Sequence, residues 1–343
     1  MASLASVALI PLVGPFHTRW PRYTVVHVRE MVRDFGPDVV ALAPLTAGAL
    51  GAPAWQDTDE VALPHTVVPW ARRRGTRVVA VGLAPGDPLD PGDDQAADDL
   101  ERYLGQYEAG QRRLARVRAA EAPVRQLLSQ ALDLGLVRTA LLPAIAAHQA
   151  QREQALGKGP GTRWHEERAA LVASRALASG GSRIALLAGV DQAPVLAEVL
   201  RGHADLVEVP EADAGAEGEV RALLDVAMRG DALHGEALLR RLAELDEPEA
   251  RYHEANLLLA ASRPEEALDS LLRLLRLDFQ DPYYLPGFAL ARLGQVYDLA
   301  QRRDDALKSY RGVLALSWAP AEAVAAATAG LNAPFGLYDA AAE

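Results

Sequence analysis

The chain of 343 residues contains no cysteine, which excludes disulfide bonds, zinc–thiolate sites, iron–sulfur clusters and cysteine nucleophiles. Aromatic residues make up only 6% of it, and no apolar run reaches the roughly 18 residues that a membrane-spanning helix needs. Basic residues are also fewer than acidic ones, 35 against 46, which gives a net charge of −11. Because an acidic surface repels phosphate backbones and anionic headgroups, we expect no binding to nucleic acid or membranes.

The residues that are abundant indicate a globular protein. Half of the chain is hydrophobic, and much of that half is alanine and leucine, which favours helices. The length is sufficient for two domains. Residues 1–13 are apolar without a basic flank and run directly into Gly14-Pro15, which is typical of a buried strand and not of a signal peptide. We therefore expect a cytoplasmic protein.

Short apolar runs alternate with helical patterns in the first two-thirds of the chain. Near-continuous apolar strands separated by helices form parallel sheets that are covered on both faces. The sequence thus predicts an N-terminal α/β domain, residues 1–210, with a mainly parallel sheet. The expected strands are 6–13, 39–42, 77–82, 183–188 and 205–209. A long helical region is expected over 100–154, with breaks near Pro123 and Pro143.

The remaining third has a different pattern. Residues 211–219 are acidic and small, which predicts an exposed linker. Residues 220–343 are helical in pattern throughout, so we expect an all-α C-terminal domain.

Six positions in that domain have the spacing of a helical hairpin. They are Leu290, Leu293, Gly294, Tyr297, Ala306 and Tyr310. This pattern resembles the tetratricopeptide repeat, in which small residues let two antiparallel helices approach and aromatic rings fill the space beside them. A weaker copy covers 250–278, and its marker Ala267 precedes Ala306 by 39 positions, against a usual period of about 34.

The resemblance implies a protein-interaction module that binds a protein or peptide partner. Residues on the inner face of the hairpins would contact that partner. The expected binding residues are Asn256, Arg292, Gln295 and Lys308.

Short motifs in the first domain carry a second resemblance. The first strand ends in Gly14-Pro15-Phe16-His17, a later helix carries Arg168 near its start, and the strand after it ends in Gly189-Val190-Asp191-Gln192. Over residues 5–209 this order resembles the TraB/Tiki group of α/β proteins, which includes relatives of erythromycin esterase. That group has an early and a late Gly-x-x-His, an acidic residue after the second strand and an arginine-bearing helix.

Two positions depart from that pattern. Ala43 stands near the acidic position, and Gln192 stands where the late histidine is expected. Neither side chain exchanges a proton near neutral pH, and neither is a strong metal ligand. We therefore predict a non-catalytic domain without metal or cofactor, in which His17 bonds to backbone.

The alternative is an enzyme, a metal-assisted or His-dependent hydrolase. Its catalytic residues would be His17, Asp191 and Arg168.

Overall fold

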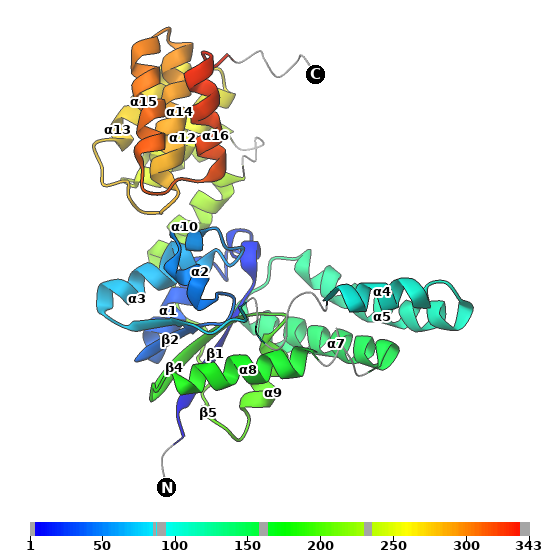
Figure 1. Cartoon of the computed structure of the whole chain (residues 1–343). Coiled ribbons are helices and arrows are strands. Elements are labelled where there is room, and N and C mark those ends of the chain that lie inside the picture. The colour runs from blue at the N-terminus through cyan, green and yellow to red at the C-terminus, as the bar shows by residue number, and fades with distance from the viewer. Residues whose placement is uncertain (1–3, 85–86, 88–93, 158–163, 230–234, 337–343) are drawn as a thin grey trace. The chain divides into compact units, whose positions relative to one another are not determined.

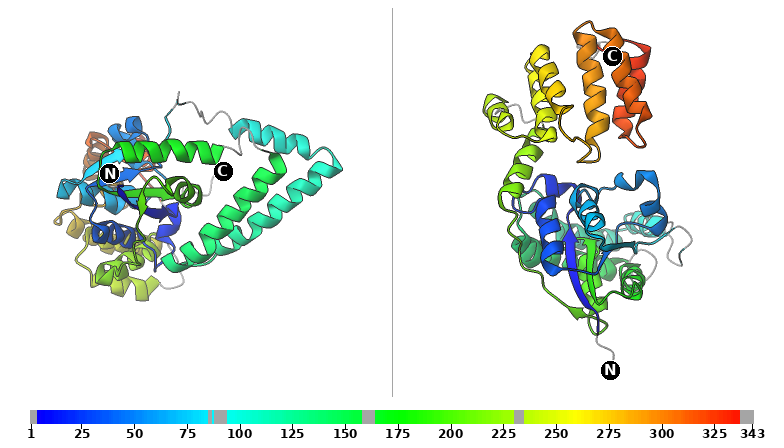
Figure 2. Two further views of the ribbon diagram at one scale, coloured as in Figure 1. Left: turned by 90° about the horizontal axis from the view of Figure 1, so that it is seen from below. Right: turned by 90° about the vertical axis from the view of Figure 1, so that its left-hand side faces the viewer.

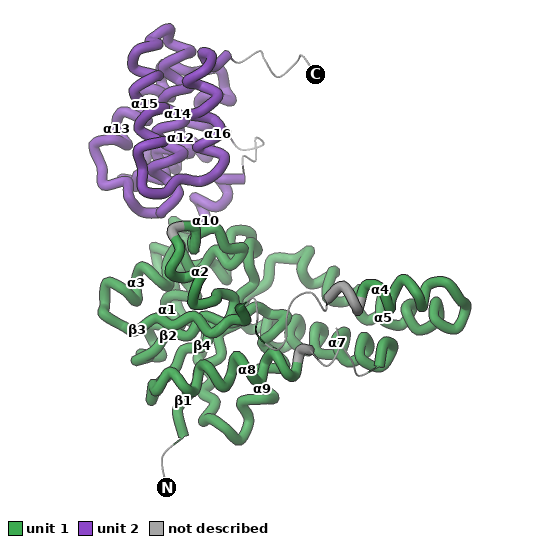
Figure 3. The backbone as a smooth tube through the Cα atoms, viewed as in Figure 1, with its two compact units in different colours: residues 1–221 green, residues 222–343 purple. Residues whose placement is uncertain are grey.

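The computed structural model describes residues 4–84, 87, 94–157, 164–229 and 235–336. It separates into two compact units (Figure 3), unit 1 of residues 1–221 and unit 2 of residues 222–343. Unit 1 is a helix-covered sheet, and unit 2 is all-helical (Figure 1). The division of the chain into a mixed α/β part and a helical part is therefore as the sequence predicts.

Five parallel strands form the sheet of unit 1, in the order β3-β2-β4-β1-β5. Each predicted apolar run contains one strand; the residues of β2 and nearly all of β4 are buried, whereas β3 is partly buried and the short edge strand β5 is exposed. The strands are β1 (Ser6–Leu12), β2 (Val39–Leu42), β3 (Arg77–Ala80), β4 (Arg183–Gly189) and β5 (Asp205–Leu206). β4 is the central strand, between β1 and β2.

Helices bury both faces of this sheet, as the continuous apolar strands require. Because side chains alternate along a strand, Val7 and its neighbour Ala8 belong to two different hydrophobic clusters. One cluster packs under α1 (Val25–Phe35), α3 (Val68–Arg74), and two π-helical segments, η3 (Leu63–Val67) and η5 (Val137–Leu141). The other packs under α8 (Trp164–Ala178) and α9 (Ala193–Leu200). Shorter segments are η1 (Gly14–Thr18), α2 (Ala47–Gly51) and η2 (Pro53–Gln56).

Most of the long connection from β3 to β4 is helical. It contains α4 (Asp94–Leu104), α5 (Glu108–Leu128), α6 (Leu134–Leu136) and α7 (Leu142–Leu156), and α5 and α7 lie side by side (Figure 2). The predicted break near Pro123 is wrong, since α5 continues through that residue. The predicted break near Pro143 is also wrong, since Pro143 stands in the first turn of α7 and the helical backbone passes into it directly from η5; the interruption lies at residues 129–133.

The acidic stretch 211–219 is largely exposed, as the sequence predicts, but it belongs to unit 1 and does not stand apart from it as a linker. Ala212 and Ala214 are buried in the core of unit 1, and α10 (Gly215–Met228) already begins within the stretch. The Arg29 guanidinium donates to both carboxylate oxygens of Glu217, at 2.5 and 2.7 Å. Glu217 thus attaches the start of α10 to α1, and its charge contributes to packing as well as to solubility.

We expect limited proteolysis of the full chain to spare residues 210–219. In Arg29→Leu the carboxylate of Glu217 loses its guanidinium, so cleavage in this stretch is expected to become faster. Peptide mapping of early fragments tests this. Early cleavage of the wild type between Pro210 and Glu219 would contradict the attachment. Residues 87–99 are rich in proline, glycine and aspartate, which predicts a loop; they lie partly outside the described residues, and from Asp94 onward they belong to α4.

Unit 2 consists of packed helical hairpins. α12 (Pro248–Ala260) pairs with α13 (Pro264–Leu274), α14 (Leu285–Leu299) pairs with α15 (Arg303–Ala315), and α16 (Ala321–Asn332) packs on the second pair. α11 (Gly235–Ala243) precedes them and packs on α12.

A tyrosine ring fills the centre of the second hairpin. Tyr310 is fully buried, and a Cβ atom built on Gly294 of α14 or Gly330 of α16 would lie 2.4 or 2.3 Å from its ring. Its hydroxyl donates to Asp298 Oδ2 at 2.9 Å, and Arg303 Nη1 lies 2.9 Å from Asp298 Oδ1. Gly294 therefore makes room for an aromatic ring as well as for a neighbouring helix.

Candidate functional site

His17 lies where β1 ends, in the short helix η1, and is completely buried. Its Nε2 accepts a hydrogen bond from the backbone N–H of Val13 at 3.2 Å, so Nδ1 carries the hydrogen and donates to Tyr23 O at 2.8 Å. Burial lowers the pKa of His17 to about 4, which keeps the ring neutral near pH 7. Both ring nitrogens are thus used to hold backbone in place, and neither faces an open cleft.

Glu60 is the titratable residue at this strand end that sequence reasoning missed. Its Oε2 accepts from the backbone N–H of Gly14 at 3.0 Å. Burial, with a smaller contribution from the negative charge of Asp191, raises the pKa of Glu60 to about 7. The residue lies in a segment without strand or helix periodicity, so nothing in the sequence pattern places it beside β1.

Glu60 and Asp191 approach each other over Gly189, the last residue of β4. A Cβ atom on Gly189 would lie 2.4 Å from Asp191 Oδ1 and 3.3 Å from Glu60 Oε1, so these oxygens are at most 5.7 Å apart. The negative charge of Asp191 therefore adds to burial in favouring the protonated form of Glu60.

Asp191 and Arg168 also line a cavity of about 250 Å³ on the α8–α9 face of the sheet. Gln192 and Ala43, the two positions that depart from the TraB/Tiki pattern, line it as well. The other lining residues are apolar: Pro44, Leu83, Ala169, Val172, Val195 and Leu196. Of the three residues proposed for the hydrolase, the structure brings Arg168 and Asp191 together in this cavity, whereas His17 is not part of its lining.

Within residues 4–84, 87, 94–157, 164–229 and 235–336, no group of three or more histidine, aspartate and glutamate side chains is placed to hold an ion. Catalytic zinc sites usually use three protein ligands.

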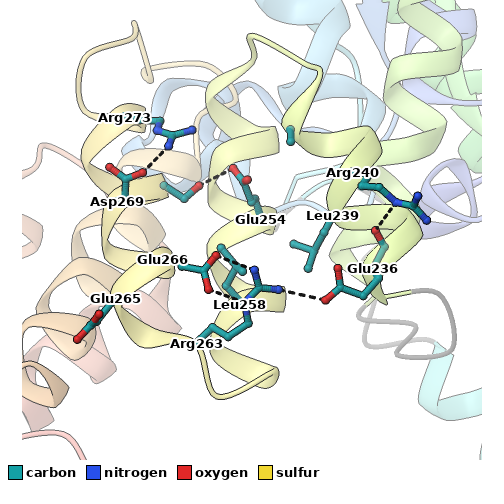
Figure 4. A pocket seen from close by; sticks show the side chains of 12 residues that line it. Glu236, Leu239, Arg240, Glu254, Leu258, Arg263, Glu265, Glu266, Asp269 and Arg273 are labelled. Atoms are coloured by element: carbon teal, nitrogen blue, oxygen red, sulfur yellow. Dashed lines mark hydrogen bonds and ion pairs between the residues drawn. The ribbon is translucent and has the colours of Figure 1, made fainter.

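A second concavity, in unit 2, is a groove of about 400 Å³ between α11, α12 and α13 (Figure 4). Arg263 lies in it between Glu236, at 3.1 Å, and Glu266, at 2.6 Å. Ser270 donates to Glu254 at 2.7 Å, and Arg273 pairs with Asp269. Most charged groups of the groove are thus paired with one another, and such exposed pairs contribute little to stability.

The four predicted binding residues lie outside this groove. Asn256 is on α12, and Arg292 and Gln295 are on α14, where Arg292 Nη1 donates to Gln295 Oε1 at 2.8 Å. Asn256 Oδ1 and Arg292 Nε are both buried without a hydrogen-bond partner among the residues that the structure describes. Lys308 is on α15, exposed, and paired with Asp305 at 3.1 Å. Arg292 and Gln295 thus share α14, whereas Asn256 lies on α12 and Lys308 on α15.

Comparison with known proteins assigns no relative to the chain. No family model, no curated protein and no solved structure matches it. Among the helices in the described ranges, none combines the length and apolar character needed to cross a membrane.

Proposed function

We propose that this chain is a non-catalytic binding protein whose unit 2 binds a polypeptide segment on the face of α12 and α14 that carries Asn256 and Arg292. The observation that carries the proposal is the pair of buried polar atoms, Asn256 Oδ1 and Arg292 Nε, without hydrogen-bond partners among the described residues. Buried polar atoms in native proteins are nearly always bonded, so an unbonded acceptor and donor on neighbouring helices favour a ligand that supplies the partners.

A peptide backbone has the matching chemistry, because it offers an N–H and a C=O in each residue. Asn256 and Gln295 are 39 positions apart, the same separation as the marker alanines, so they occupy equivalent places in consecutive hairpins. Packed helices lie about 8–10 Å apart. An extended peptide rises about 3.3 Å per residue. Asn256 and Gln295 are therefore spaced to contact peptide residues that are about three positions apart.

The remaining parts of the proposal come from the sequence. Unit 2 is proposed to be tetratricopeptide-like, and unit 1 a TraB/Tiki-like domain that has lost the family's catalytic groups. The partner is proposed to be a protein or peptide in the cytoplasm, not a nucleic acid or a membrane, because the chain carries a net charge of −11.

Peptide display against the full chain tests this function. Peptides selected on the wild type are expected to bind Asn256→Leu and Arg292→Gln roughly 10–100-fold more weakly, since each variant removes one polar contact that is made in a buried setting. Fluorescence anisotropy with the selected peptides measures the loss.

Arg311→Gln is the matched control, because Arg311 is exposed on α15. It should leave the affinity unchanged. Peptides that bind both test variants as tightly as the wild type, or a selection that yields none, would contradict the proposal.

The second candidate function is the hydrolase, and the carboxylate pair of Glu60 and Asp191 is the observation that favours it. A buried carboxyl group with a pKa near 7 is suited to general acid–base catalysis. Arg168 lines the cavity beside Asp191. His17 contributes least to this alternative, because its two nitrogens already bond to backbone.

We expect no turnover of generic ester and peptide substrates by the full chain with added zinc, manganese or cobalt. Asp191→Asn is the diagnostic variant, since His17→Ala would remove two backbone hydrogen bonds and disturb the fold. Turnover by the wild type that Asp191→Asn abolishes would replace the binding proposal with the enzyme.

A further inference from the structure

The cavity of unit 1 lies where α/β proteins bind small ligands. It is at the carboxyl ends of the strands: Ala43 and Pro44 follow β2, Leu83 follows β3, and Asp191 and Gln192 follow β4. Its volume of about 250 Å³ is below the range of about 300–1,000 Å³ that drug-sized ligands occupy. The space is suited to a small metabolite.

The cavity wall is divided into an apolar part and a polar part. Val172 and Leu196 are buried in the core, and Val195 and Leu83 are partly buried at the wall. Among the described residues that line the cavity, the polar side chains are those of Arg168, Asp191 and Gln192. A ligand that fills this space therefore has an apolar body and one compact polar end.

Two of the polar groups are withdrawn from solvent. Gln192 Oε1 is buried and has no hydrogen-bond partner among the described residues. A ligand with a hydrogen-bond donor at this position would satisfy it. The Nε and Nη2 atoms of Arg168 are buried as well. A guanidinium is always charged, and its fork of donors suits a carboxylate.

We propose that this cavity binds an apolar α-amino acid. The carboxylate of the ligand lies against Arg168, its ammonium group donates to Gln192 Oε1 and the Asp191 carboxylate, and its side chain packs between α8 and α9. The guanidinium of Arg168, the carboxylate of Asp191 and the amide oxygen of Gln192 are together complementary to a zwitterion, and an analogue with a single charge lacks one of the matching groups.

Calorimetric titration of the full chain with L-leucine tests the proposal. Two analogues are titrated in parallel, 4-methylpentanoate, which lacks the ammonium group, and 3-methylbutylamine, which lacks the carboxylate. Leucine is expected to bind, and each analogue to bind at least about tenfold more weakly, as expected for the loss of a charge-assisted hydrogen bond. No heat with leucine at millimolar concentration, or equal binding of an analogue, overturns the proposal.

Two variants locate the site. Gln192→Leu removes the acceptor and should weaken leucine binding about tenfold or more, whereas Gln130→Leu, at an exposed glutamine after α5, should not. A second kind of variant fills the cavity. Val195→Phe adds volume at the partly buried wall and should abolish leucine binding. If circular dichroism shows that Val195→Phe is unfolded, Ala169→Val is used in its place. Unchanged affinity in Gln192→Leu and in the folded cavity-filling variant overturns the assignment. Binding of peptides to unit 2 is measured separately, so either proposal can fail without the other.

Discussion

Gly294→Ala is expected to destabilise unit 2 strongly, and Gly330→Ala to do the same. In each case the new methyl group would lie less than 2.5 Å from the Tyr310 ring, which is fully buried and has its hydroxyl fixed on Asp298. Overpacking of this kind typically costs about 1–3 kcal/mol, and the ring cannot rotate away without losing its hydrogen bond. Urea unfolding of the full chain, followed by the fluorescence of Trp318, measures the change.

Gly312→Ala is the matched control on α15. A Cβ atom there would lie 3.4 Å from Leu290 Cδ1 and 3.9 Å from Leu290 Cδ2, which are ordinary contacts. Alanine is favoured over glycine inside a helix by about 0.5–1 kcal/mol, so this variant is expected to be neutral or more stable. A double-mutant cycle that combines Gly294→Ala with Tyr310→Ala tests whether the Tyr310 ring causes the destabilisation. If Gly294→Ala costs as much in the Tyr310→Ala background as in the wild type, the ring is not the source of the clash.

Glu60→Gln is expected to make unit 1 more stable at pH 8 and to change its stability little near pH 4.5. Burial raises the pKa of Glu60 from its usual 4.5 to about 7, so the folded state binds the proton more tightly than the unfolded state. Stability that comes from this proton is complete below pH 4.5 and is lost as the pH rises to about 7. The loss is on the order of 2–3 kcal/mol, and glutamine avoids it because its amide does not titrate while its oxygen still accepts from Gly14 N–H.

The measurement is the difference in unfolding free energy between the variant and the wild type at a series of pH values, with the buried Trp20 as the reporter. Glu219→Gln, at an exposed carboxylate on α10, is the control. Its difference in unfolding free energy from the wild type should not change with pH. If the difference in unfolding free energy for Glu60→Gln is also independent of pH, Glu60 titrates as an ordinary surface carboxyl group.

The strands and most helices could be predicted because their signals are local. A run such as Val39–Leu42 is apolar at every position, and only a strand buried on both faces requires that. The helices of unit 2 follow from the spacing of small and large residues, for example Gly294 and Tyr297. These patterns depend on neighbours within a few residues, which the sequence displays directly.

The candidate site could be predicted only in part, because its contacts join distant segments. Glu60 reaches Gly14 across 46 positions, and Glu217 reaches Arg29 across 188. No periodicity encodes either contact. The acidity of 211–219 predicts exposure, which most of its residues show, but it does not predict that the Glu217 carboxylate attaches α10 to α1. His17 was identified by its motif, but its burial depends on Tyr23 and Val13 folding over it.

The central position of β4 has a consequence for how the chain acquires its fold. β4 pairs with β1 at seven positions and with β2 at four, so it joins two strands that do not touch each other. During synthesis the first 180 or so residues emerge before this strand, and the facing edges of β1 and β2 stay without their backbone partners until then. A nascent chain or truncated product that stops before Arg183 therefore presents two open, apolar strand edges, and such edges pair readily with other chains.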